Sequence, residues 1–520
     1  MKNAKEYIDE KYPQNTRNQI IELDIGNELL EGHLDLNDFI NLQKLDCSNG
    51  IITKTKNEIT SLDVSKCLQL TKLSCSRNLI SDLNISNNTQ LTKLECSRNK
   101  ISDLNVTKNV NLNELHCSYN KINYLNIINN KELSTLDCSS NKDLTSLDVS
   151  KNTNLVKLNC SSNDLTSLDV SKNTNLVKLN CSSNKIAYLD LNNCSDIREL
   201  NVGTNNLTSL DISKCNKLSD LYCYNNKLDK LDISFCPELT RLNCSNNLLD
   251  NLDFESSKSL TYLNMNDNKF YKDLSCFSSL INLEELSIWN NSFFGSLKFL
   301  CNLTKLKYLY IKNTDIDSGL EYLSSANLKI IQCPTEDRPE SKVSLIEQNL
   351  KPYKKEDFSD WYDFQAWRKD NLFLIEKAKE IIELEQEVQK LRIERKQLTE
   401  IANIIAPNIP FDFKNLILEI KKLKANDLNY QIQLQKAELK QLTEIKFDGD
   451  AQEMWELFCE AHEEIIKNNA NSFANKQLAR AKKSLSRKLN EAELQVILDS
   501  DNRYTKINAL EKQLRNLYEE

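Results

Sequence analysis

The chain has 520 residues, of which 40% are apolar and 27% charged, and its net charge is −8 at pH 7. This length supports more than one folded unit, while the acidic balance argues against a nucleic-acid or membrane-surface binder, because both need a basic face. No apolar run approaches the roughly 18 residues of a membrane span, and no secretory leader opens the sequence, so we expect a cytoplasmic protein.

The first forty residues predict a cap for the repeat that follows them. Residues 4–12 favour a short helix that ends at Pro13. The segments Ile20–Ile25 and Leu34–Leu36 are typical of strands. A repeat array must cover its first apolar face, so we assign residues 1–40 to an N-terminal cap.

Residues 41–334 form a repeat, whose clearest unit is Leu-Thr-Lys-Leu-Glu-Cys-Ser-Arg-Asn at 91–99. The apolar position before its turn recurs in fourteen rows: Cys47, Cys75, Cys96, Cys117, Cys138, Cys160, Cys181, Val202, Cys223, Cys244, Met265, Ile288, Ile311 and Cys333. Residues 144–163 and 165–184 are identical, so whole units have been copied. Fixed residue types at a fixed period of about 21 residues predict a solenoid of stacked coils.

Eleven of the fourteen rows also have a ladder asparagine, three residues after the apolar position. These are Asn78, Asn99, Asn120, Asn141, Asn163, Asn184, Asn205, Asn226, Asn247, Asn268 and Asn291. A primary amide has two donors and an acceptor, with which it can satisfy the backbone of the turn.

A second Leu-x-apolar motif in each unit, such as Leu83-Asn84-Ile85, predicts a second strand per coil. Two strands that stack at the same spacing of about 4.8 Å would keep the solenoid nearly straight over 60–265. Beyond Met265 the units lengthen, so we expect the far side to become helical there and the curve to sharpen.

These residues resemble the leucine-rich repeat family, in the class with the short repeat Leu-x-x-Leu-x-Leu-x-x-Asn-x-Leu-x-x-Leu-Asp-Leu-x-x-Asn. The resemblance covers the repeat, about 290 of the 520 residues. It implies an α/β repeat fold, here a β-solenoid with two short parallel strands per coil, followed by an all-α region. It also implies a scaffold for binding other proteins. Cysteine often stands where the family has leucine, and Gly50 and Thr314 replace the ladder asparagine.

Most of the seventeen cysteines occupy the position of the repeat that Val202 and Met265 occupy in their own units. They therefore act as small apolar fillers. We therefore expect reduced core thiols rather than disulfides. No Cys-x2-Cys pair suggests a metal site, and we expect no metal and no cofactor.

The residues that flank the second Leu of each unit face outward and form two columns along the solenoid. Most of these side chains are expected to be ordinary solvated strand positions. Tyr, Trp and Arg dominate the energy of protein interfaces, however, and they gather in the C-terminal third. The candidate partner-binding residues are Tyr222, Arg241, Tyr262, Trp289, Tyr308 and Tyr310.

Residues 335–370 contain a polar connector and then six aromatic residues, Tyr353, Phe358, Trp361, Tyr362, Phe364 and Trp367. If these aromatic residues were exposed, they would form a recognition patch. We favour the alternative, in which they pack over the last coil as a C-terminal cap.

Residues 371–520 have a helical period and resemble a coiled coil. Pro407 and Pro410 break the first helix, and a second helix is expected over 413–445, with shorter ones beyond it. The helices either pair two chains as a homodimer or fold back as a hairpin within one chain, and the sequence leaves both open.

Catalysis finds little support, because seven glycines provide no phosphate-binding loop and the three histidines lie far apart. The layout resembles bacterial effectors in which leucine-rich repeats precede a helical, cysteine-type ubiquitin ligase domain. Their nucleophile belongs to a Cys-x-Asp-Arg motif, whereas Cys459 is followed by Glu-Ala-His. We therefore predict a non-enzymatic protein-interaction scaffold; the alternative is a ubiquitin ligase or ligase adaptor with Cys459 as nucleophile and the repeats selecting substrates.

Overall fold

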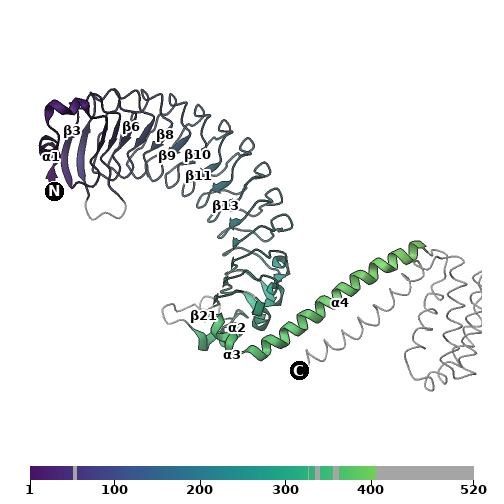
Figure 1. Ribbon diagram of the computed structural model, residues 1–520. Coiled ribbons are helices and arrows are strands. Elements are labelled where there is room, and N and C mark those ends of the chain that lie inside the picture. Colours follow the sequence, from purple (N-terminus) through teal and green to yellow (C-terminus); the bar gives the residue numbers. More distant parts are fainter. Residues whose placement is uncertain (51–55, 326, 334–339, 355–361, 406–520) are drawn as a thin grey trace, which may run out of the picture. The chain divides into compact units, whose positions relative to one another are not determined.

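The computed structural model describes residues 1–50, 56–325, 327–333, 340–354 and 362–405 (Figure 1). The chain divides into two units, Met1–Leu372 and Phe373–Glu520. The first unit contains the whole repeat and its caps, and the described part of the second is a single helix.

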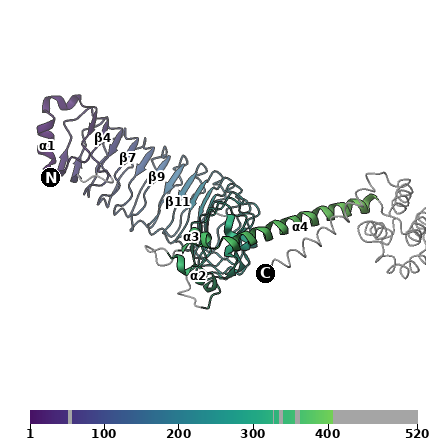
Figure 2. The ribbon, with the colours of Figure 1, turned by 60° about the horizontal axis from the view of Figure 1, so that its bottom comes forward.

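The first unit is a solenoid whose coils each contribute one short strand to a long sheet (Figure 2). In the described residues this sheet has sixteen strands, parallel except for the last. In spatial order they are β2 (Glu22–Asp24), β4 (Lys44–Asp46), β6 (Lys72–Ser74), β7 (Lys93–Glu95), β8 (Glu114–His116), β9 (Thr135–Asp137), β10 (Lys157–Asn159), β11 (Lys178–Asn180), β12 (Glu199–Asn201), β13 (Asp220–Tyr222), β14 (Arg241–Asn243), β15 (Tyr262–Asn264), β16 (Glu285–Ser287), β18 (Tyr308–Tyr310), β20 (Ile330–Gln332) and β21 (Tyr362–Asp363).

Leucines and thiols fill the interior of the coils. Leu94 at the centre of β7 pairs in register with Leu73 and is completely buried, as is Cys96, the residue directly after the strand. Burial raises the pKa of the Cys96 thiol to about 12. The thiolate is therefore scarce at neutral pH, and these cysteines behave as apolar filler.

The ladder asparagines join each coil to the one before it. Asn99 donates from Nδ2 to the carbonyl oxygens of Cys75 and Cys96, both at 3.0 Å, and its Oδ1 accepts from the amide of Ile80 at 3.0 Å. Asn78, Asn120 and most of the later ladder asparagines repeat this pattern. A buried amide thus satisfies backbone groups that the strands leave without partners.

The residue before each ladder asparagine has a left-handed backbone. Its φ lies between 49° and 62° in a row of non-glycine residues: Arg77, Arg98, Tyr119, Ser140, Ser162, Ser183, Thr204, Asn225, Asn246, Asp267 and Asn290. Asn313, before Thr314, has the same conformation. Asn and Asp tolerate this conformation better than Arg, Tyr or Thr do. The bonds of the neighbouring ladder asparagine hold the turn in place against this strain.

The prediction of a second strand in every coil is wrong between β6 and β15. In this block Leu83-Asn84-Ile85 and its counterparts belong to no strand. Its central Asn or Asp closes a turn, since Asn84 Oδ1 accepts from the amide of Ser86 at 3.1 Å and Asp148 Oδ1 from that of Ser150 at 2.9 Å. Asp35 and Asp63 make the same bond at the ends of the paired strands β3 (Leu30–Asp35) and β5 (Glu58–Asp63), so the turn alone does not decide whether this flank pairs.

Among the described residues, two small further sheets form, one towards each end of the solenoid. The first, near the N-terminus, contains β1 (Lys2–Asn3), β3 (Leu30–Asp35) and β5 (Glu58–Asp63), and the second, near the C-terminus, contains β17 (Phe294–Ser296) and β19 (Asp315–Ser318).

The predicted straightness is wrong for the same reason. One flank of the regular block is held at the strand spacing of about 4.8 Å, and the other flank has no strand pairing to hold it. Figure 1 shows the result, an arc in which the long sheet lies on the concave side and the loops spread apart on the convex side.

The far side does become helical beyond Met265, as predicted, in short 3-10 segments. These are η2 (Leu274–Phe277), η3 (Leu297–Leu300) and η4 (Leu320–Ser325). Buried aromatic rings pack beneath them. Phe277 lies 5.7 Å from Phe254 and 5.4 Å from Phe293 between ring centroids, and Phe293 lies 5.6 Å from Phe270.

The N-terminal end is covered by α1 (Ala4–Lys11) and η1 (Gln14–Gln19). The Asn3 side chain caps α1 by accepting from the amides of Lys5 and Glu6. The buried Arg17 ties this cap together: its guanidinium reaches Asp9 at 2.6 Å and Asp38 at 3.1 Å, and its Nε donates to the Tyr12 carbonyl at 2.8 Å.

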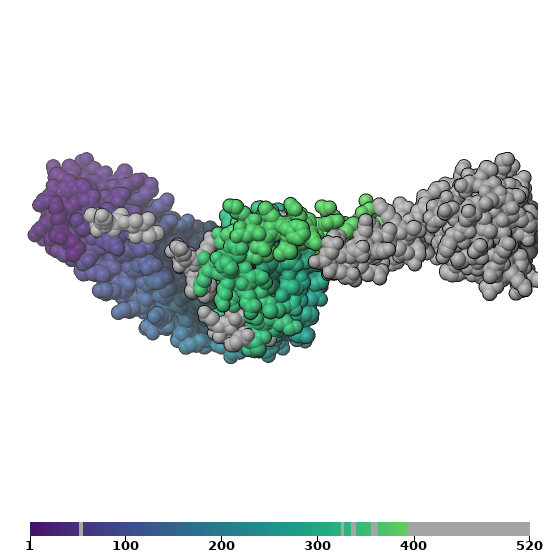
Figure 3. All heavy atoms as spheres, turned by 90° about the horizontal axis from the view of Figure 1, so that it is seen from below, coloured from purple at the N-terminus to yellow at the C-terminus, as the bar shows by residue number. Residues whose placement is uncertain are grey.

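The C-terminal end of the repeat is covered by α2 (Ser344–Leu350), η5 (Lys351–Tyr353), β21 and α3 (Phe364–Asp370) (Figure 3). β21 pairs antiparallel with β20, the last strand of the solenoid. Tyr362, Phe364 and Trp367 are buried, and the rings of Phe364 and Trp367 stack at 5.5 Å. Phe358 and Trp361, predicted in the same cluster, lie outside the described residues.

The helix α4 (Leu372–Ile405) begins and ends where the sequence predicts, just before the segment that contains Pro407. Its buried residues recur at spacings of three and seven: Ile375, Ala378, Ile381, Val388 and Leu391. Within the described ranges, no helix has the length and apolar character of a membrane span. The helices predicted from 413 onward, and Cys459, lie outside those ranges.

Candidate functional site

The concave sheet presents two outward columns of side chains. In each three-residue strand the central leucine points into the core, so the residues on either side of it face outward. The strands pair in register, which aligns Asp220, Arg241, Tyr262, Glu285 and Tyr308 in one column. Tyr222, Asn243, Asn264, Ser287 and Tyr310 form the other column. Five of the six sequence-predicted binding residues therefore lie on one face of β13, β14, β15 and β18.

Three of these predicted residues are in direct contact. Arg241 donates from Nε to the Tyr222 hydroxyl at 2.9 Å, and its guanidinium carbon lies 4.8 Å from the centre of the Tyr262 ring. Asp220 completes the group, with its Oδ1 3.5 Å from Arg241 Nε. The bond to Tyr222 and the charge of Asp220 raise the pKa of Arg241. The guanidinium is thus held over the ring of Tyr262 on the strand surface.

Tyr308 and Tyr310 lie two residues apart on β18 and share its outward face. Burial, followed by the charge of Glu285, raises the pKa of Tyr310 to about 12. Burial also raises the pKa of Tyr262. The phenols of Tyr262 and Tyr310 stay protonated at neutral pH, so they offer hydroxyl donors together with ring surface.

Trp289 lies apart from the two columns, in the turn that follows β16. Its carbonyl accepts from the amide of Asp267 at 3.1 Å and from Asn291 Nδ2 at 3.0 Å. Its indole Nε1 is buried and has no hydrogen-bond partner among the described residues. The structure therefore places Trp289 beside the strand surface rather than on it.

Sequence reasoning did not select Glu285 and Asp220, although both lie in the same column as Arg241 and Tyr262. The in-register pairing of coils was the signal that could have found them, because it makes equivalent positions of successive units neighbours.

The same concave face has a shallow hollow of about 420 Å³ over the coils from β8 to β13. Polar side chains line it, among them His116, Asp137, Lys157 and Asn180, and Tyr222 lies at its C-terminal end. Lys178 is paired with Glu199 on the next strand. The hollow extends the candidate surface along the axis of the solenoid.

The coil geometry defines a class of protein, the solenoids in which every coil repeats one short parallel strand and an amide-closed turn. Solved structures share it. The functional domain of InlJ from Listeria monocytogenes, described as including a cysteine ladder, has 30% sequence identity and a TM-score of 0.54, and the match covers 60% of this chain and 72% of that chain.

Two further structures show the same fold at lower identity. A leucine-rich repeat protein of Leptospira interrogans has 24% identity and a TM-score of 0.53, with 62% of this chain and 87% of that chain covered. The internalin InlF of Listeria monocytogenes has 20% identity and a TM-score of 0.50, with 64% and 94% covered. No protein-family model and no curated protein matches the sequence. The chain belongs to the leucine-rich repeat proteins.

Proposed function

We propose that this chain is a non-enzymatic scaffold that binds a protein partner on the concave face of its solenoid. The observation that carries the proposal is the arrangement of Arg241 between Tyr222 and Tyr262, with Tyr308 and Tyr310 on the same face. Tyr and Arg are the residues that most often dominate interface energy. Side chains already fixed by their neighbours lose little freedom when a partner binds, which favours affinity.

The test is recovery of partners by the tagged full-length chain from a lysate of its own source cells. We expect the double variant Tyr262→Ala, Tyr308→Ala to recover the main partner at least about tenfold less well, since each hot-spot side chain contributes about 1–2 kcal/mol or more.

The matched control is Tyr124→Ala, Tyr188→Ala. This control also replaces two tyrosines by alanine. Tyr124 and Tyr188 are 64% and 67% exposed, but they lie outside the strands. Undiminished recovery by the concave-face variant, or equal loss in both variants, would count against the proposed surface.

We also propose that the C-terminal helices mediate self-association or a second protein contact. The apolar residues of α4 recur at heptad spacing, and Leu374, seven residues before Ile381, is 49% exposed in the single chain, which suits a contact with a second helix. We expect the full-length chain in solution to have twice the mass of one 60.1 kDa chain, and Leu374→Asp to return it to the single-chain mass. Light scattering after size exclusion measures this. A single-chain mass for the unmodified protein would favour the intramolecular hairpin.

A further inference from the structure

Glu285 is an acidic residue set among aromatic side chains. It lies on β16 directly between Tyr262 of β15 and Tyr308 of β18, each one strand spacing of about 4.8 Å away. Tyr310 lies in the adjacent column on the same strand as Tyr308. Burial raises the pKa of Glu285, and the positive charge of Arg241 opposes that rise.

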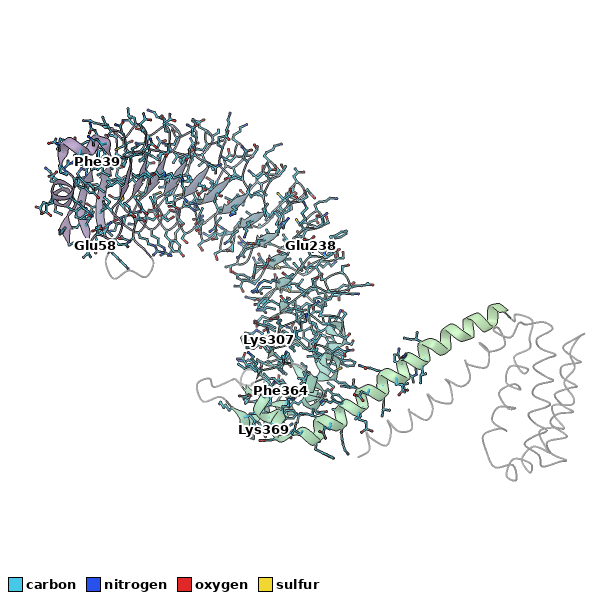
Figure 4. All side chains as sticks on the ribbon, in the orientation of Figure 1. Phe39, Glu58, Glu238, Lys307, Phe364 and Lys369 are labelled. Atoms are coloured by element: carbon cyan, nitrogen blue, oxygen red, sulfur yellow. The ribbon has the colours of Figure 1, made fainter. Side chains whose placement is uncertain are left out.

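Neighbouring acids have partners that Glu285 lacks. Asp220 faces Arg241, and Glu284 accepts from Lys307 at 2.6 Å, the lysine labelled in Figure 4 directly before β18. Among the residues that the structure describes, the Glu285 carboxylate makes no ion pair and no hydrogen bond. A half-buried carboxylate without a cation is unfavourable, and an arriving cation would remove that cost.

The preceding coils show what such a group of residues can hold. There a carboxylate (Asp220), a phenol hydroxyl (Tyr222) and an aromatic ring face (Tyr262) together surround the guanidinium of Arg241. Glu285, Tyr308 and Tyr310 repeat the same three chemical groups on β16 and β18, but no cation of the described residues is bound among them.

We propose that Glu285, Tyr308 and Tyr310 form a subsite for a basic side chain, arginine or lysine, of the protein partner. This inference rests on the proposed function and adds the chemistry of the contact. The carboxylate supplies a charge-assisted bond and the rings supply cation–π contact. A planar guanidinium can make both contacts at once, so arginine is the better fit.

The test uses three capped peptides, acetyl-Gly-Arg-Gly-amide and its Lys and Gln counterparts, with the full-length chain. The chain carries 3-fluorotyrosine, and the ¹⁹F signals of Tyr308 and Tyr310 are assigned with Tyr308→Phe and Tyr310→Phe. We expect the Arg and Lys peptides to shift both signals, and the Gln peptide to bind about tenfold more weakly, because it lacks the charge.

Glu285→Gln should abolish the preference for basic peptides, while Glu284→Gln, one residue away, should keep it. Circular dichroism shows that each variant folds. Equal shifts with the Arg and Gln peptides, or an Arg preference that survives in Glu285→Gln, would overturn the inference.

The result is separable from the partner-recovery experiment. Loss of partner in Tyr262→Ala, Tyr308→Ala together with no preference for basic peptides would keep the proposed function and reject the subsite. Unchanged partner recovery would reject the proposed surface and, with it, the assignment of this subsite to the partner, even where basic peptides bind through Glu285.

Discussion

Asn205→Ala is expected to lower the free energy of unfolding by about 3 kcal/mol, because it removes three buried hydrogen bonds at roughly 1 kcal/mol each. The amide of Ile186 loses its partner, whereas the carbonyl oxygens of Cys181 and Val202 keep bonds from Asn184 and Asn226. Asn205 donates to the carbonyl oxygens of Cys181 at 3.1 Å and Val202 at 3.0 Å, and its Oδ1 accepts from the amide of Ile186 at 3.0 Å. These bonds join neighbouring coils, so the loss should weaken the coupling between them.

The adjacent Asn206 provides the matched control. It is the same residue type and only partly buried, and its own contact with a neighbouring coil is a backbone bond to Ile186. Asn206→Ala should therefore change stability by less than about 0.5 kcal/mol. Urea denaturation followed by circular dichroism compares the two variants. Similar midpoints would mean that the ladder amides do not hold the coils together.

Phe277→Ala is expected to destabilise the C-terminal coils by about 4 kcal/mol, the usual cost of removing a fully buried phenylalanine. The ring is completely buried and bridges those of Phe254 and Phe293. Because each coil contacts only its neighbours, the effect should be local. Hydrogen exchange should accelerate in the coils from β15 to β18 and stay unchanged near β6.

Phe299→Ala on the next 3-10 segment is the control for Phe277→Ala. Phe299 is 42% exposed, so its removal should cost less than about 1 kcal/mol. Equal exchange rates in the two variants would show that the aromatic cluster does not stabilise this end of the solenoid.

The sequence predicted the long sheet because its signal is local and repeated. Leu-x-x-Leu-x-Cys fixes both the strand and its buried face, so Leu94 and Cys96 could be placed in the core from spacing alone. The start of α4 and its end before Pro407 were predictable for the same reason.

The error on the second flank came from taking strand periodicity as evidence of strand pairing. Leu83-Asn84-Ile85 and its counterparts bury their apolar residues in the core, but they belong to no strand. A pattern of apolar positions shows which face is buried and does not show whether neighbouring coils pair, so the arc was not predictable from it.

The candidate site was predictable only in part. The regular period of the repeat places Tyr222, Arg241 and Tyr262 on neighbouring strands, and the structure shows them in contact. The later units are longer, yet their strands still pair in register with those of the regular units. The extra residues lengthen the segments between strands, and Trp289 lies in one of these segments. The position of Glu285 between two tyrosines depends on the register across that change of length.

The identical units at 144–163 and 165–184 pair in register, Lys157 with Lys178 and Asn159 with Asn180. Copying such a unit creates only junctions that the chain already contains. Each added or deleted copy therefore changes the separation between the first coils and the tyrosine-bearing coils by one strand spacing, about 4.8 Å. The reach between two molecules held at opposite ends of the array is thus set in discrete steps by gene length, with no redesign of either contact.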